Sequence, residues 1–179
     1  MSRIQSLNEF WPFYLSEHRS PTSRKLHFVG TSWFLGTVGA SFVLSPIFFP
    51  PAFVGMVGLG YVATKMESKK AAFLPMAGMV GLMSAAAPLT IPAGIVGAYA
   101  MAWIGHFRVE HNRPATFTYP VWSLVSDLKM WGHMARGRLW KGDPLEELNL
   151  NYEAPAAVAE GLSVDAVGSA PKAEAVRSL

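Results

Sequence analysis

Histidines are the residues in this chain best suited to chemistry, and four of the five stand beside its long apolar stretches. His18 and His27 lie at the start of the first stretch, and His106 and His111 lie at the end of the last. Neutral imidazole is the commonest metal ligand in proteins, and several imidazoles with a carboxylate suit Fe(II) or another divalent transition metal. These four histidines are therefore candidate metal ligands. The alternative is that they bridge lipid headgroups and backbone carbonyls at a membrane interface.

Two glutamates directly precede two of these histidines, Glu17 before His18 and Glu110 before His111. His106 and Glu110 are four residues apart and share a face if the helix continues through them. Each glutamate is a candidate catalytic residue that could act as a ligand, fix an imidazole tautomer or accept a proton. Ion pairs with neighbouring arginines are the alternative role.

A second group of polar residues is suited to binding an anionic substrate. A guanidinium can hold a carboxylate in a bidentate fork, whereas binding of lipid phosphates is the competing role, above all for Arg24. The candidate substrate-binding residues are Arg19, Arg24, Arg113 and Asn112. The fifth histidine, His133, lies near Lys129 and Arg136 and is expected to be solvated.

Two apolar blocks must position these residues, because residues 26–64 and 71–107 contain no Asp, Glu, Lys or Arg. Each block is about twice as long as one helix needs to cross about 30 Å of hydrocarbon. Prolines at 46, 50 and 51 and at 88 and 92 interrupt the two blocks near their middle. We therefore expect an all-α integral membrane protein with four transmembrane helices arranged as two hairpins. Their approximate ranges are 26–45, 52–66, 71–87 and 93–109.

The distribution of charge predicts how these helices are oriented. Every Lys and Arg lies in the N-terminal segment, in the Lys65–Lys70 connection or after residue 107. The positive-inside rule then places both termini and this connection in the cytoplasm, and we expect a bacterial inner membrane. The formal net charge is only +3. Because the basic residues flank the apolar blocks instead of forming a stripe, we expect membrane lipids as partners and no nucleic acid.

Each predicted helix also carries a Gly-x-x-Gly pair, which would let helices approach closely in lipid. Glycine is common in membrane helices in any case, and this is the alternative explanation. The four pairs are Gly36 with Gly39, Gly55 with Gly58, Gly78 with Gly81, and Gly94 with Gly97.

The segments outside the apolar blocks predict two interfacial amphipathic helices and a tail. In the C-terminal one, apolar residues recur at helical spacing from Val121 to Trp131, and Trp122, Trp131 and Trp140 are expected at headgroup level. The other precedes the first span. Residues 141–179 turn acidic and then rich in Ala, Ser, Gly and Pro, so we expect a mostly disordered tail. The membrane-embedded catalytic domain would then cover residues 1–140.

Several enzyme classes are excluded by missing residues. There is no cysteine, so the chain can form no disulfide, thiolate metal site or cysteine nucleophile. The sequence also lacks a Gly-x-Ser-x-Gly elbow, a Walker loop, a Rossmann glycine fingerprint and a His-Glu-x-x-His motif. Five histidines are too few for the histidine boxes of membrane fatty-acid desaturases.

Two stretches of the chain resemble a known family. Residues 13–31 read FYLSEHRSPTSRKLHFVGT and residues 103–131 read WIGHFRVEHNRPATFTYPVWSLVSDLKMW. They resemble a small membrane family first defined as a domain of unknown function, whose fungal member is an iron(II)-dependent 2-hydroxy fatty acid dioxygenase of phytosphingosine breakdown. The resemblance covers about residues 5–140. The positions that match its motifs are His18, His27, His106 and Glu110.

The resemblance implies Fe(II) as cofactor, and a long-chain 2-hydroxy fatty acid and O2 as substrates. The implied reaction is oxidative removal of the carboxyl carbon, which gives a fatty acid one carbon shorter and CO2. Atom balance closes with water as the only further product, so neither 2-oxoglutarate nor NADPH is required. Two alternatives stay open: a non-enzymatic membrane scaffold or lipid-binding protein, and a metal-dependent lipid hydrolase.

Overall fold

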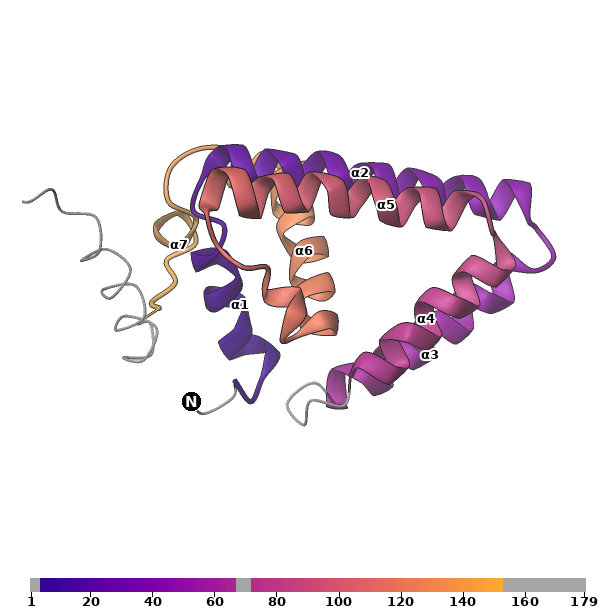
Figure 1. The fold of residues 1–179 in the computed structure, drawn as a ribbon. Coiled ribbons are helices and arrows are strands. Elements are labelled where there is room, and N and C mark those ends of the chain that lie inside the picture. Colours follow the sequence, from indigo (N-terminus) through magenta and orange to yellow (C-terminus); the bar gives the residue numbers. More distant parts are fainter. Residues whose placement is uncertain (1–3, 67–71, 153–179) are drawn as a thin grey trace, which may run out of the picture.

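The computed structural model describes residues 4–66 and 72–152, and this part of the chain is all-helical without a strand (Figure 1). The four helices expected from the apolar blocks are present, joined by shorter elements. The elements are α1 (Leu7–Ser16), α2 (Pro21–Leu44), α3 (Phe49–Met66), α4 (Phe73–Ala86), α5 (Thr90–Ile104), the π-helix η2 (Gly105–Glu110), the 3-10 helix η3 (Ala115–Phe117), α6 (Pro120–Ala135) and α7 (Pro144–Glu147). The connection at 67–71 lies outside the described residues.

The pairing of the four long helices differs from the two hairpins predicted. α2 packs along α5 and α3 packs along α4, whereas the sequence neighbours α2 and α3 touch little (Figure 1). The prediction of two separate hairpins was therefore wrong. The chain forms one long hairpin that is bent where α2 meets α3 and where α4 meets α5. The proline-containing turns lie at this bend and redirect both arms of the same hairpin.

The two turns at the bend are held together by polar and aromatic contacts. The Ser45 hydroxyl donates to the Ala86 carbonyl at 2.8 Å, and Ser41 and Thr90 share a hydrogen bond between their side chains. Phe49 is fully buried beside Met83 and Ile91. The bend is thus a small core of its own.

The close contact between α2 and α5 depends on the last of the four glycine pairs. A side chain at Gly94 would overlap Thr37, and one at Gly97 would overlap Trp33. Gly36 and Gly39, in contrast, have open space around them. Glycine spacing therefore marks a helix contact at one pair and an open surface at another.

The main aromatic core lies between α1, α6 and the segment that follows α6. Phe10 is fully buried, and its ring centroid lies 5.1 Å from Tyr119 and 5.8 Å from Trp122. Both segments expected to be amphipathic are helices, but each buries aromatic residues against the other. The predicted headgroup position of Trp122 was wrong, since this side chain is buried and donates to the Thr64 carbonyl.

The buried face of α6 is also not the one that its apolar residues indicated. Ser123 and Ser126 are buried, whereas Leu128 is exposed. Trp131 and Trp140 likewise donate to protein acceptors, the Ser32 hydroxyl and the Met134 carbonyl. In this chain the serine-lined side of α6 faces the other helices.

The folded region continues past the boundary expected at residue 140. α7 begins at Pro144 after the N-cap Asp143, and Leu145 is buried in the main core. Residues 141–152 therefore pack on the domain. The rest of the predicted tail, 153–179, lies outside the described residues.

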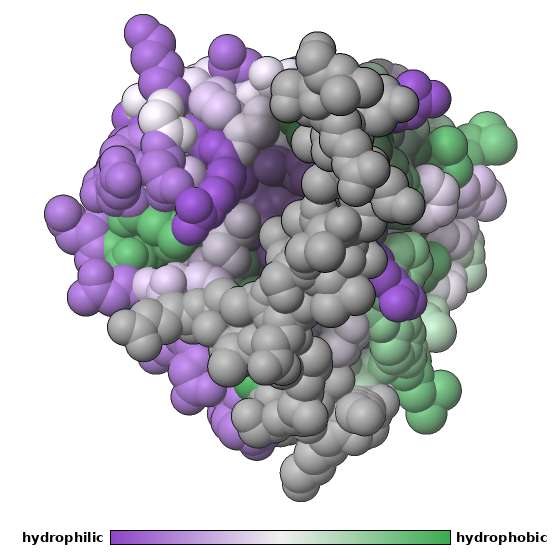
Figure 2. All heavy atoms as spheres, turned by 60° about the vertical axis from the view of Figure 1, so that its left-hand side comes forward, coloured by the Kyte–Doolittle hydropathy of each residue, from purple (hydrophilic) through white to green (hydrophobic). Residues whose placement is uncertain are grey.

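Among the described helices, α2 is long and apolar enough to cross a membrane by length and composition. Four membrane crossings thus stay a prediction. Large apolar side chains are nevertheless exposed at the bend, where Ile47 is 75%, Phe48 69% and Leu89 83% exposed. Figure 2 shows hydrophilic residues gathered on one part of the visible face and hydrophobic residues on another.

Candidate metal centre

Three histidines from three segments meet in the interior. His18 lies in the turn between α1 and α2, His27 in the second turn of α2, and His106 in η2 at the end of α5. All three are buried, and their ligand nitrogens lie within 4.8 Å of one another. The Nε2 atoms of His18 and His27 are 3.2 Å apart, a separation that two imidazoles on one metal ion can adopt.

A hydrogen bond to Nδ1 fixes the orientation of each of these rings. Nδ1 of His18 donates to the Tyr14 carbonyl at 2.6 Å, Nδ1 of His27 to the Asp127 carboxylate at 2.7 Å, and Nδ1 of His106 to the Asn112 amide oxygen at 2.7 Å. Because each Nδ1 faces an acceptor, the proton lies on that nitrogen and Nε2 carries a lone pair.

The three inward-facing lone pairs are the observation that fits a metal ion. Two unprotonated nitrogens 3.2 Å apart repel each other unless a cation attracts both. Three neutral imidazoles with outer hydrogen-bond partners match the donor chemistry of divalent iron, zinc or copper. The residues present therefore fit a transition metal held by His18, His27 and His106.

Burial keeps His18 and His106 in the neutral form that a metal requires. It lowers the pKa of His106 to about 4 and lowers the pKa of His18 well below its ordinary value. His27 and His106 add to the effect at His18, because a second positive charge so close is unfavourable. At neutral pH these imidazoles are thus free of the proton that would compete with a cation.

The carboxylate of Asp127 on α6 accepts several hydrogen bonds, including the one from His27. Besides His27, its carboxylate accepts from the Tyr14 hydroxyl at 3.0 Å and from the Thr31 hydroxyl. Burial alone would raise the pKa of Asp127, but the bonds from these three donors lower it below the usual range. The carboxylate is therefore ionised and balances positive charge at the centre.

An apolar cavity of about 340 Å³ leads away from the histidines. His27, His106, Asp127 and Thr31 line its polar end, and most of the remaining wall consists of apolar side chains from α2 to α6. Its volume is within the range of small-molecule sites, about 300 to 1,000 Å³. The arrangement suits an amphipathic ligand with a polar head at the histidines.

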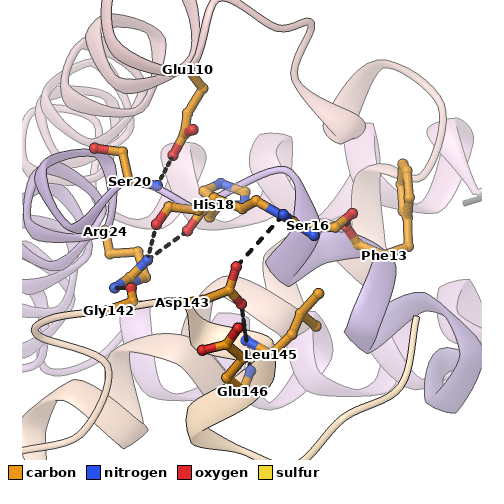
Figure 3. A network of polar contacts seen from close by, with 11 residues as sticks. Phe13, Ser16, His18, Ser20, Arg24, Glu110, Gly142, Asp143, Leu145 and Glu146 are labelled. Atoms are coloured by element: carbon orange, nitrogen blue, oxygen red, sulfur yellow. Dashed lines mark hydrogen bonds and ion pairs between the residues drawn. The ribbon is translucent and has the colours of Figure 1, made fainter. Parts of the chain in front are cut away.

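The predicted substrate-binding residue Arg24 binds other parts of the chain. Its side chain is fully buried, and its five N–H groups all point to backbone carbonyls, of which those of His18 and Gly142 are seen in Figure 3. The acceptors are the carbonyls of His18, Arg19, Leu139, Lys141 and Gly142, at 2.6 to 3.2 Å. Every N–H donor of Arg24 thus has a protein acceptor in this structure, and its role in substrate binding stays a prediction. Arg24 ties the His18 turn to the segment after α6.

The other two arginines lie outside the centre. The Arg19 side chain is 60% exposed and lies 3.6 Å from the Asp143 carboxylate. Arg113 is exposed and stacks over Phe117, with 5.0 Å from its guanidinium carbon to the ring centroid. Neither residue lines the cavity.

Asn112, predicted to bind substrate, contacts a histidine instead. Its amide oxygen accepts from His106, and its amide nitrogen donates to the Glu17 carbonyl at 2.8 Å. Both ends of the amide are therefore occupied by the protein. Asn112 connects the His106 ring to the backbone next to His18.

The two predicted catalytic glutamates lie behind the His18 turn and do not line the cavity. Glu110 accepts from the backbone N–H of Ser20, the N-cap of α2, at 2.9 Å (Figure 3). Burial, with a further contribution from Glu110, raises the pKa of Glu17. Glu110 thus holds the start of α2 and does not join the group of metal ligands.

His111 and His133 are both separate from the three clustered histidines. His111 is exposed, with a φ of 54° in the left-handed region at the end of η2. The candidate ligand His111 is therefore not brought to the centre. His133 is half-buried and stacks on Trp11, with ring centroids 5.9 Å apart, so it is less solvated than expected.

Sequence reasoning missed Asp127, Tyr14 and Thr31. One signal was available for Asp127: it is an isolated carboxylate among the apolar residues of α6. Its partner could not be read from spacing, because His27 lies 100 positions away.

One comparison with known proteins identifies a family. A sequence model described as 2-hydroxy-palmitic acid dioxygenase Mpo1-like matches residues 4–139, which include all three histidines and Asp127. No curated protein and no solved structure shows significant similarity to the chain.

Proposed function

The chain belongs to the Mpo1-like family, described as 2-hydroxy-palmitic acid dioxygenase Mpo1-like, and we propose that it is an iron(II)-dependent dioxygenase of long-chain 2-hydroxy fatty acids. The reaction would consume one O2 and remove the carboxyl carbon as CO2. The remaining chain would leave as the acid one carbon shorter, with one water. The conversion of the acid releases four electrons and the reduction of one O2 to water consumes four, so no further reductant is needed.

The observation that carries this proposal is a cluster of three histidines, two of which, His27 and His106, line the polar end of an apolar cavity. A scaffold would not require three imidazoles with aligned lone pairs, and the long apolar wall beside them favours a ligand with an alkyl chain. A 2-hydroxy acid matches both parts, since its carboxylate and hydroxyl can chelate a cation while its chain needs an apolar environment.

In this proposal Nε2 of His18, His27 and His106 would hold the iron. When bound, Fe(II) supplies a Lewis acid for the carboxylate and 2-hydroxyl and a site for O2. The residues of the chain itself orient the imidazole rings and balance positive charge at the centre. Tyr14, Asp127 and Asn112 keep each Nδ1 protonated and each Nε2 directed inward. The apolar wall excludes water from the reacting head group.

We further propose that α2 to α5 are embedded in a membrane, with the bend at its deepest point. The charged residues of the described helices lie at the opposite ends from the bend, and the bend exposes Ile47, Phe48 and Leu89. Cytoplasmic termini and a bacterial inner membrane remain the expected location. The natural absence of cysteine allows a direct test. Ile47→Cys should resist a membrane-impermeant maleimide in intact vesicles, while Arg136→Cys should react.

The first experiment is metal analysis of detergent-purified protein prepared without O2, followed by O2 uptake with a long-chain 2-hydroxy acid. About one iron per chain and uptake equal to CO2 release are expected. His18→Ala, His27→Ala and His106→Ala should each lose iron. His111→Ala is the matched control and should keep it, because His111 is exposed and outside the cluster.

The two alternatives give different results in the same experiment. Fatty-ester cleavage that continues without O2 would point to a metal-dependent lipid hydrolase. A protein that purifies without any metal, and whose histidine variants behave like the wild type, would indicate a scaffold or lipid-binding protein. Either outcome would overturn the dioxygenase assignment.

A further inference from the structure

The apolar cavity has an inner end as well as a polar end. Going along α2, His27, Thr31, Leu35 and Val38 all line it. Eleven residues separate His27 from Val38, which corresponds to about 16 Å of helix at about 1.5 Å per residue. The cavity therefore extends over most of one membrane leaflet from the histidines toward the bend.

The core of the bend closes this inner end. Met83 and Ile91 line the cavity and belong to the buried cluster around Phe49. Phe53, one turn after Phe49, also lines the cavity and packs against the same cluster. Behind these side chains there is only packed protein, because Phe49 is fully buried and Ala87 is 5% exposed. The depth of the cavity is thus set by a few large side chains.

The side of the cavity is open where apolar residues reach the surface. Tyr99 and Trp103 of α5 and Leu128 of α6 line it and are each more than a third exposed. An alkyl chain can therefore enter sideways from a hydrocarbon environment, while its head group remains at the histidines. Four methionines of α3 and α4 also contribute to the wall, and their flexible thioethers can adapt to a bound chain.

We propose that this cavity measures the alkyl chain of the substrate, and that Phe53 and Met83 set the longest chain accepted. This inference rests on the proposed function, because it takes the histidines as the position of the polar head. Three bonds of an extended backbone span about 3.8 Å, so about 16 Å accommodates roughly a dozen bonds of an extended alkyl chain. A saturated chain of this length that follows α2 from His27 reaches Val38, near the inner end of the cavity that Phe53 and Met83 line.

The test is a binding series with the iron-loaded protein under strict exclusion of O2, so that ligands bind without turnover. Saturated 2-hydroxy acids that differ by two carbons displace a fluorescent fatty acid, and the longest acid that still competes defines the cut-off. Phe53→Ala and Met83→Ala should move this cut-off to longer acids, and Met83→Trp to shorter ones. One methylene too many at the closed inner end of the cavity changes discrimination by about 10- to 200-fold, so the shift is measurable.

Val54→Ala is the matched control, since Val54 is the neighbour of Phe53 on α3 but is 71% exposed. Its cut-off should equal that of the wild type. Using two independent positions protects the test against the loss of one variant through misfolding. An unchanged cut-off in folded Phe53→Ala and Met83→Ala would overturn the inference.

Admission of O2 to the same samples separates the two proposals. In one outcome, both alanine variants move the cut-off to longer acids but the wild-type protein releases no CO2. This result would support the measuring cavity and contradict the dioxygenase. In the other outcome, the protein oxidises the acids, but the range of chain lengths is the same in the wild type and both alanine variants. This result would support the dioxygenase and contradict the measuring cavity.

Discussion

Oδ1 of Asp127 lies 2.7 Å from Nδ1 of His27, although 100 residues separate them in the chain. The contact joins α6 to α2 and makes a carboxylate the outer partner of a candidate ligand. Such outer partners fix the tautomer of the ligating imidazole and raise its basicity. The metal centre is therefore completed by a helix that provides none of its three histidines.

Asp127→Asn tests this relationship. The substitution keeps the shape of the side chain but removes its charge, so His27 loses its anionic partner while one oxygen remains as an acceptor. We expect iron affinity to fall about 10- to 100-fold, measured by competition with a chelator of known affinity. Glu146→Gln removes one charge from an exposed position of α7 and should leave the affinity unchanged. Equal affinities for Asp127→Asn and the wild type would contradict the role of Asp127.

Arg24→Met tests whether Arg24 supports the fold and not the substrate. Five backbone carbonyls lose their donor, two of them in buried hydrogen bonds, and each unsatisfied buried group costs about 1 to 3 kcal/mol. We expect a loss of at least about 3 kcal/mol in the free energy of unfolding, measured in detergent with denaturant.

The control for this prediction is Arg19→Met. Its exposed ion pair with Asp143 should contribute no more than about 1 kcal/mol. If Arg24→Met were as stable as Arg19→Met and raised KM alone, Arg24 would be a substrate ligand after all.

Gly94→Ala tests the contact between α2 and α5. The added methyl group would overlap the short side chain of Thr37, which has little room to move. Overpacking of this kind costs about 1 to 3 kcal/mol. Gly36→Ala makes the same chemical change on α2 where nothing lies nearby, and it should be neutral or slightly stabilising. Thermal unfolding in detergent compares them, and equal midpoints would refute the close contact.

The metal-free protein should lose stability as the pH falls from about 6.5 toward 4. Burial lowers the pKa of His106 to about 4, so in this interval the unfolded chain binds a proton that the folded chain does not. The free energy of unfolding then rises with pH up to about 6.5 and levels off above it. Unfolding midpoints across this range measure the slope. His106→Gln should reduce it, and a slope identical to that of the wild type would exclude His106 as its source.

Part of the candidate metal centre could be predicted from the sequence, because the pattern of apolar and charged residues marks where the helices lie. The charge-free blocks identified four helices, and His18, His27 and His106 stand where those helices begin and end. The pairing of the helices could not be predicted, because both hairpin arrangements satisfy the same hydropathy pattern. α2 also begins at Pro21 and not near residue 26, since Ser20 caps it and proline is favoured in the first turn.

The contacts of residues near the centre could not be predicted where distant parts of the chain provide the partners. An arginine is a residue type that often binds anions. Only the position of residues 139–142 shows that the N–H donors of Arg24 already bind backbone carbonyls. Ser123 and Ser126 made one side of α6 look solvated, yet that side faces the other helices. Sequence spacing shows which residues are neighbours on one helix, whereas the roles of these residues depend on contacts between different helices and segments.

The bonds from Arg24 to the segment after α6 have a consequence for the order in which the protein can form. The His18 turn acquires its full set of partners only once residues 139–142 have been synthesised and docked. A nascent chain that stops before this point contains every histidine of the centre but lacks the acceptors that fix Arg24 and, through it, the turn. The centre can therefore assemble correctly only after translation has passed the end of the domain.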